Sequence, residues 1–210
     1  MSNAENGEIK LSNVRLAFSD SLFEKKSMIG ADGKPSDPRH SVVLIIEPGS
    51  ANDKALSALL SAVAIEKWKD KAAGIVKKLT EENRVCYLKR DKTDKSGEVY
   101  DGFEGKYSVT ASSKGHVSVF GRNPKNPDGT PRYLMEADGV VYPGCFVNAV
   151  VQVWAQQNSW GLRLNATLKG VQFVADGDAF TATKAASPDA FDDLGVDPAA
   201  DALSGSGSLI

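Results

Sequence analysis

Two long segments of alternating apolar and polar residues lie between residues 146 and 174. They run from Phe146 to Ala155 and from Trp160 to Val174, and only the polar residues 156–159 separate them. A period of two places the apolar side chains on one face of a β-strand and the polar side chains on the other. Two such strands joined by a short polar connection form a β-hairpin, so this region predicts an antiparallel sheet with one buried face.

Shorter segments with strand patterns precede this hairpin. They are rich in β-branched and aromatic residues, and they comprise Glu8 to Phe18, His40 to Glu47, Arg84 to Arg90, Lys106 to Ser112 and His116 to Phe120. Residues 19–39 and 121–130 lack periodicity and collect Gly and Pro, which predicts a mobile loop and a turn-rich loop. With five or more strands and one helix between early strands, the predicted fold is mainly β, an OB-like antiparallel β-barrel.

One strong helix is predicted between the early strands. Ser50 can cap its free amides, and Asp53 occupies the third helical position. Apolar residues follow at helical spacing, namely Leu56, Leu59, Leu60, Val63 and Trp68, with Ile75, Val76 and Leu79 continuing the pattern past Gly74. The lysines on its polar side could contact phosphate, but we favour the interpretation that they form the solvated face of an amphipathic helix.

Charge divides the chain into two parts. From Asp176 onward there are seven Asp and one Lys, a net charge of −6, whereas residues 1–175 hold 24 Lys and Arg against 20 Asp and Glu, a net charge of +4. The C-terminal part is also rich in Ala, Ser and Gly, and it cannot bury enough apolar surface to offset the entropy of ordering. We therefore expect one OB-like domain over residues 1–175 and a flexible, disordered acidic tail over residues 176–210.

The sequence carries no pattern of a catalytic or metal site. His40 and His116 have no Cys or carboxylate at ligand spacing, and no phosphate-binding glycine motif occurs. Cys86 and Cys145 are expected to be reduced, buried thiols. We therefore predict no enzymatic activity, no metal and no cofactor. No apolar run approaches the roughly 18 residues of a membrane span, and the polar start is unlike a signal peptide, so we expect no membrane association and a cytoplasmic location.

The polar faces of the strands indicate a binding surface. Between Leu162 and Lys169 the apolar residues fall on one face, while Arg163, Asn165 and Thr167 fall on the other, with Trp154 beside Arg163 across the hairpin. Flat rings interleaved with cations suit an unpaired nucleic-acid strand, because rings stack on bases and cations attract phosphates. The candidate DNA-binding residues are Arg15, Tyr87, Lys89, Arg90, Phe103, Lys106, Tyr107, Arg122, Trp154 and Arg163. The alternative is that Tyr87, Tyr107 and Phe120 fill the barrel core.

Five segments together resemble one family. They are Lys10-Leu-Ser-Asn-Val-Arg-Leu-Ala-Phe18, the strand from His40 to Glu47 leading into a helix, Gly102-Phe-Glu-Gly-Lys-Tyr107, Tyr142-Pro-Gly-Cys-Phe-Val-Asn148, and residues 161–177. The resemblance spans Ile9 to Phe180. It is to phage-encoded single-stranded-DNA-binding proteins of OB fold, a family first known as a domain of unknown function and similar to the helix-destabilising proteins of phage replication.

The resemblance implies a function and its partners. The protein would coat single-stranded DNA without regard to sequence during phage DNA replication and recombination in an infected bacterial cell. The acidic tail would modulate binding or contact phage replication or recombination proteins, and the residues expected to dock are Phe191, Asp192, Asp193 and Leu194, two apolar side chains beside carboxylates. The end of the chain, Ser208-Leu209-Ile210, departs from the family pattern because it lacks a dense acidic run with a terminal aromatic residue. A homodimer is left open.

Two alternatives from other classes follow from the same residues. A phage adaptor or structural β-barrel would use its exposed aromatic residues to bind protein, and its tail would only solubilise it. A nuclease would require a cluster of carboxylates that binds Mg²⁺, which the scattered acidic residues do not supply.

Overall fold

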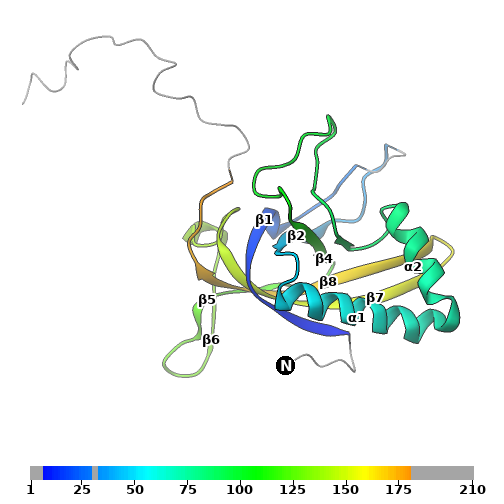
Figure 1. Cartoon of the computed structure of the whole chain (residues 1–210). Helices are drawn as coiled ribbons and strands as arrows, with labels where there is room; N and C mark the ends of the chain where they lie inside the picture. Colours follow the sequence, from blue (N-terminus) through cyan, green and yellow to red (C-terminus); the bar gives the residue numbers. More distant parts are fainter. Residues whose placement is uncertain (1–6, 30–32, 181–210) are drawn as a thin grey trace, which may run out of the picture. The chain divides into compact units, whose positions relative to one another are not determined.

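The computed structural model describes residues 7–29 and 33–180, and this part of the chain is built around one β-barrel (Figure 1). Five strands form the barrel: β1 (Glu8–Lys26), β2 (Arg39–Ile46), β4 (Tyr107–Ser113), β7 (Phe146–Asn158) and β8 (Gly161–Ala175). Neighbouring strands follow the order β4-β2-β1-β7-β8, and β4 also pairs with β8, which closes the sheet. This is the predicted mainly β, OB-like barrel.

The barrel closes through a parallel pairing. Ser112 of β4 lies opposite Thr167 of β8 in parallel register, whereas the other barrel strands pair with their neighbours in antiparallel register. The β7–β8 hairpin has the longest pairing, from Phe146 opposite Ala175 to Asn158 opposite Gly161, with register shifts after Phe146 and after Val150. The alternating pattern therefore predicted the hairpin correctly, but it could not predict the parallel pairing of β4 with β8.

β1 is longer than its apolar pattern predicted. It continues to Lys26, so the first part of the expected mobile loop belongs to the sheet. Its pairing with β2 shifts register between Ala17 and Ser21, and Phe18 within this irregularity has a φ of 47°. A bulge interrupts the alternation by which a strand is identified in a sequence, and this is why residues 19–26 look like a loop.

Apolar side chains from the barrel strands and from α1 (Ala51–Trp68) share one buried core. Leu56 and Leu59 of the helix belong to this core, and α1 packs against β1 and β7. As predicted, the Ser50 hydroxyl caps the helix by accepting a hydrogen bond from the Asp53 amide at 3.2 Å.

A second helix follows α1 after a break. The 3₁₀ turn η2 (Lys69–Lys71) joins α1 to α2 (Ala72–Glu81), so the predicted continuation past Gly74 exists as a separate helix. Trp68 and Leu79 pack with Leu164 of β8 in a small second core. Within the part of the chain that the structure describes, no helix is long and apolar enough to cross a bilayer.

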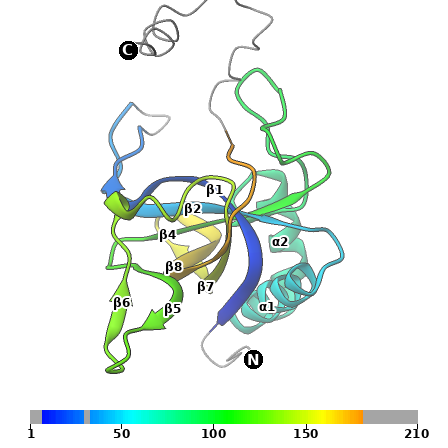
Figure 2. The same ribbon diagram turned by 90° about the vertical axis from the view of Figure 1, so that its left-hand side faces the viewer.

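Three short strands lie outside the barrel. β3 (Tyr87–Leu88) pairs with β4, and β5 (Ser118–Lys125) forms a hairpin with β6 (Pro131–Tyr133) and pairs with β8 in parallel register. Figures 1 and 2 show this hairpin on the opposite side of the barrel from α1 and α2. Residues 121–125 of the expected loop therefore belong to β5. Pro124 made this segment look like a loop in the sequence, but a proline is tolerated in an edge strand. The 3₁₀ turn η3 (Glu136–Asp138) follows the hairpin.

Residues 176–180 pack against the 142–144 segment and β1. The Tyr142 hydroxyl donates to Asp176 at 3.0 Å, the Phe180 amide donates to the Pro143 carbonyl at 3.0 Å, and the Arg15 guanidinium lies 4.3 Å from the Phe180 ring centroid. The compact unit consequently extends to Phe180, beyond residue 175 where we expected the tail to begin. The expected docking residues 191–194 lie outside the described residues.

Candidate nucleic-acid interface

A cleft of about 610 Å³ lies over the seam where β4 and β8 close the barrel. Thr110 and Ser112 of β4 line it together with residues 163–167 of β8. Segment 83–93, which contains β3, lines it from one side, and Arg39 of β2 and Trp154 of β7 complete the lining. The cleft thus lies on the third and fifth barrel strands, β4 and β8, and takes only Arg39 from the second, β2.

The cleft has a marked excess of positive charge. Its cations are Arg39, Arg84, Arg90, Lys92 and Arg163, and its single carboxylate is Asp91. The Asp91 carboxylate accepts a hydrogen bond from the Gly105 amide at 2.8 Å. Among the residues that the structure describes, only one of these cations, Arg84, has a carboxylate within 4.0 Å, that of Glu82 at 3.8 Å. Such a cluster of cations favours a polyanion.

Trp154 provides the aromatic surface of the cleft. Its indole Nε1 donates a hydrogen bond to the Thr167 hydroxyl at 3.0 Å, and 41% of the residue remains exposed. In the β7–β8 register Trp154 lies opposite Asn165, and Arg163 lies opposite Gln156. Trp154 and Arg163 are therefore diagonal neighbours on one face, close enough to act on one ligand.

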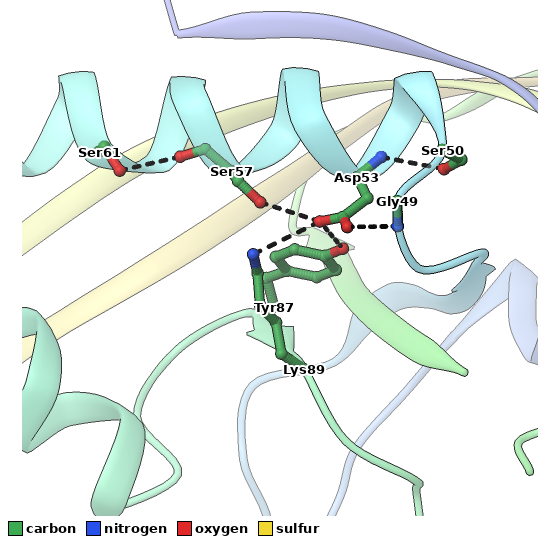
Figure 3. Close-up of polar contacts among 7 residues, drawn as sticks. All are labelled: Gly49, Ser50, Asp53, Ser57, Ser61, Tyr87 and Lys89. Atoms are coloured by element: carbon green, nitrogen blue, oxygen red, sulfur yellow. Dashed lines mark hydrogen bonds and ion pairs between the residues drawn. The ribbon is translucent and has the colours of Figure 1, made fainter. Parts of the chain in front are cut away.

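Asp53 of α1 links the helix to segment 83–93, which lines the cleft (Figure 3). Its carboxylate accepts hydrogen bonds from the Gly49 amide at 2.8 Å, the Tyr87 hydroxyl at 2.9 Å and the Ser57 hydroxyl at 3.0 Å, and Lys89 Nζ lies 3.4 Å away. Burial alone would raise the pKa of Asp53, but these donors outweigh it and lower the pKa to about 2. Asp53 is therefore a charged acceptor at neutral pH, and it fixes β3 and the start of segment 89–93.

Trp160 stands at the tip of the β7–β8 hairpin, next to a cation of the cleft. It is 83% exposed, and its carbonyl accepts a hydrogen bond from Arg84 Nη2 at 2.8 Å. The next residue, Gly161, has a φ of 94°, and a Cβ there would lie 2.8 Å from the same guanidinium. Glycine at this position therefore permits both the tight turn and the close approach of Arg84.

The structure brings three of the ten predicted residues together in the cleft and leaves the others elsewhere. Arg90, Trp154 and Arg163 line it. The predicted residues that do not line it are Arg15, Tyr87, Lys89, Phe103, Lys106, Tyr107 and Arg122.

Two of these outlying rings are buried. Tyr87 donates to Asp53, and Phe103 packs with Ala17 and Val43 in a small core between the barrel and the segment that follows β3. Tyr107 is half-buried, with its ring 6.1 Å from that of Tyr87. The alternative of a role in the barrel core thus describes the position of Tyr87, whereas Phe103 lies in a core separate from that of the barrel.

The outlying cations have protein partners. Lys89 pairs with Asp53, Lys106 Nζ lies 2.6 Å from a Glu47 carboxylate oxygen, and Arg15 donates to the Asp178 carbonyl at 2.6 Å. Arg122 lies on β5, 5.8 Å from the Phe173 ring centroid.

Sequence reasoning missed three cations of the cleft, Arg39, Arg84 and Lys92. Arg39 lies at the end of a stretch that lacks periodicity, and only the closure of β4 on β8 brings it to the cleft. Arg84 could have been predicted, because it begins the expected strand segment whose last residue, Arg90, was a DNA-binding candidate.

Comparisons with known proteins agree on one family. Residues 7–203 match the family model described as Enterobacter phage Enc34, ssDNA-binding protein. A protein called p50 from Acyrthosiphon pisum secondary endosymbiont phage 1 is 36% identical over 191 residues, which cover 90% of this chain and 95% of that protein.

Solved structures are similar as well. The single-stranded DNA-binding protein from bacteriophage Enc34 in complex with ssDNA has a TM-score of 0.61 at 21% identity, covering 83% of this chain and 90% of that chain. Another structure of that protein has a TM-score of 0.60 at 20% identity, covering 89% and 90% of the two chains.

The solved structures confirm the OB-like fold, and the family model spans most of the chain. A family of this kind binds DNA and does not catalyse a reaction, in agreement with the prediction of a protein that is not an enzyme. The chain belongs to the family of the Enterobacter phage Enc34 single-stranded-DNA-binding protein.

Proposed function

We propose that the protein binds single-stranded DNA in the cleft over the β4–β8 seam, without reading the base sequence. Trp154 stacks on a base, and the five cations of the cleft contact successive phosphates. Trp160, held at the hairpin tip beside Arg84, extends the aromatic surface at one end. The observation that carries this proposal is the combination of an exposed indole with an excess of unpaired cations in one cleft.

The chemistry of the cleft favours binding that is tolerant of sequence. Every base has a π-face on which Trp154 can stack, and every nucleotide carries a phosphate. The neutral polar side chains on the strands, Thr110, Ser112, Asn165 and Thr167, can each hydrogen-bond to sugar or phosphate oxygens. A binding mode of this kind coats and protects unwound DNA, and it suits phage DNA replication and recombination in an infected bacterial cell.

The acidic tail is proposed to compete with DNA for the cleft or to recruit replication or recombination proteins. Residues 181–210 contain five Asp and one Lys, a net charge opposite in sign to that of the cleft. The motif from Phe191 to Leu194 would contact such partners. The alternative function is a phage adaptor or structural barrel that binds protein through its exposed rings and does not bind nucleic acid.

Fluorescence titration with oligo-dT tests the proposal. We expect the binding of oligo-dT to quench tryptophan fluorescence, and oligonucleotides of mixed sequence to bind with similar affinity. Arg163→Glu should weaken binding strongly, because it replaces a phosphate contact with a repulsive charge. Lys77→Glu is the matched control, since Lys77 is an exposed residue of α2 outside the cleft and undergoes the same change of charge.

Equal effects of the two charge reversals would show that only overall charge matters and would remove the cleft from the proposal. If the wild type bound no oligonucleotide at low salt, the adaptor function would be favoured instead.

A further inference from the structure

The β5–β6 hairpin carries a second aromatic surface, separate from the cleft. Phe120 of β5 and Tyr133 of β6 lie directly opposite each other and stack, with ring centroids 5.2 Å apart and an angle of 28° between the ring planes. Tyr133 is 52% exposed, and the His116 ring meets it edge-on at 6.2 Å. Phe120 is half-buried, so the exposed ring of Tyr133 is the one that can accept a further flat ring.

The same hairpin carries three cations that have no acidic partner. Arg122, Lys125 and Arg132 are exposed, and within the described part of the chain none of them has a carboxylate within 4.0 Å. Asp128, the one acidic residue of the hairpin, accepts hydrogen bonds from the Thr130 amide and hydroxyl at 2.9 and 2.6 Å and so belongs to the turn. Arg122 and Arg132 also line one shallow pocket of about 250 Å³.

The same face of β8 connects this hairpin with the cleft. Thr167, which holds Trp154, lies opposite Gln152, and Gln172 lies opposite Asn148, four residues earlier on β7. Residues four apart on a strand share a face, so Thr167 and Gln172 share one as well. Residues an odd number apart on a regular strand lie on opposite faces, but Lys169 is the extra residue of a bulge on β8 and restores the shared face. Lys169 itself is exposed.

The hairpin is firmly attached at the end of this face. Gln172 lies opposite Phe120 in the parallel register, and its amide donates to the Arg122 carbonyl at 3.1 Å. At Gly170 a Cβ would lie 3.1 Å from the Ser118 carbonyl oxygen, so glycine allows β5 to approach β8 closely. Because of the bulge, the step from Thr167 to Gln172 matches four residues of β7, a distance of about 13 Å along the strand, with Lys169 between them.

From these observations, and resting on the proposed function, we propose that the β5–β6 hairpin is a second contact for the same DNA strand. A strand leaving the cleft passes Lys169, stacks a base on the Phe120–Tyr133 pair and places its phosphates near Arg122, Lys125 and Arg132. Three cations without a carboxylate partner, on a hairpin that also exposes the Tyr133 ring, complement a polyanion with bases better than they complement an apolar protein surface.

The test compares two lengths of oligo-dT by fluorescence anisotropy with the full-length protein. The short one is the shortest that saturates the wild type, near the lower limit of about 4 nucleotides for an OB-fold, and the long one has about 16 nucleotides. Tyr133→Ala should weaken binding of the long oligonucleotide by about 10-fold, as expected for one lost base stack, and leave the short one unchanged. Tyr133→Phe keeps the ring, and Met135→Ala removes a neighbouring exposed side chain, so both should bind both lengths like the wild type.

A second variant, at an exposed residue, keeps the proposal testable if Tyr133→Ala does not fold. Arg132→Glu should reduce the salt dependence for the long oligonucleotide by about 0.7 in the log–log slope per lost phosphate contact, with no change for the short one. Equal losses for both lengths, or no loss for the long one, would overturn the second contact. If Arg163→Glu weakened binding while the hairpin variants did not, only the second contact would be refuted. A wild type that bound neither length would refute the proposed function as well.

Discussion

Replacing Asp53 with Ala should destabilise the protein strongly, because it removes the charged acceptor that joins α1 to β3. Three donors lose their partner, the Gly49 amide, the Ser57 hydroxyl and the Tyr87 hydroxyl, and Lys89 loses its counter-ion. Tyr87 is buried, so its hydroxyl bears most of the desolvation penalty.

The magnitude follows from these contacts. A net hydrogen bond to a charged group contributes about 1.5–3 kcal/mol, and the Gly49 and Ser57 donors can recover part of theirs with water, which gives a loss of about 3–4 kcal/mol in the free energy of unfolding. That is a large share of the roughly 5–15 kcal/mol of a typical domain. Tyr87→Phe removes only one donor to this carboxylate and should cost about 1.5–3 kcal/mol.

Urea unfolding followed by circular dichroism measures these losses, with Asp70→Ala as a control that removes an exposed carboxylate from η2. Because the pKa of Asp53 is lowered from 3.8 to about 2, its ionised form stabilises the folded state above about pH 4, and this contribution is lost as the pH falls towards 2. The difference between wild type and Asp53→Asn should therefore shrink over that range. A difference below about 1 kcal/mol, or one independent of pH, would refute the role of Asp53 as a charged clamp.

Four further predictions concern the cleft, the tail and the thiols. Trp154→Ala should weaken oligo-dT binding by about 10-fold with little change in Tm, whereas a core role predicts a loss of about 3–5 kcal/mol in stability. Five phosphate contacts would give a log–log salt slope of about −3.5, and a flat response would remove them. Deletion after Phe180 should tighten binding at low salt and less so at high salt, and an unchanged affinity would count against competition by the tail. Burial raises the pKa of Cys86 to about 12, so this thiol should react with thiol reagents only on unfolding, and fast labelling of the native protein would contradict its buried position.

Local patterns predicted the elements in which a long alternation or a capping motif is clear in the sequence. The β7–β8 hairpin and the helix start at Ser50 belong to this class, because each depends on neighbours in sequence. The end of β1 was missed at the bulge after Ala17, and the predicted strand ended at Phe120 because the rest of β5 contains Gly121 and Pro124. The parallel pairing of Ser112 with Thr167 joins distant parts of the chain, so no local period could indicate it.

Two of the three predicted residues that line the cleft lie where side-chain direction follows from alternation, and the third, Arg90, lies just after the short strand β3. Arg163 and Trp154 lie on long regular strands, and both line the cleft. Phe103 lies in an irregular segment, where the sequence does not reveal that the ring folds back into a small core of its own. Arg39 comes to the cleft only through barrel closure. An aromatic residue near a cation is therefore a binding candidate only when the strand around it fixes the face on which it lies.

Photo-crosslinking tests the central claim most directly. Oligo-dT carrying iodinated uracil would be irradiated in complex with the full-length protein, and the modified peptides identified by mass spectrometry. We predict adducts at Trp154 and in segment 83–93, with loss of the first in Trp154→Ala. Adducts confined to the lysine-rich face of α1 and α2, with none among the residues of the cleft, would contradict the account.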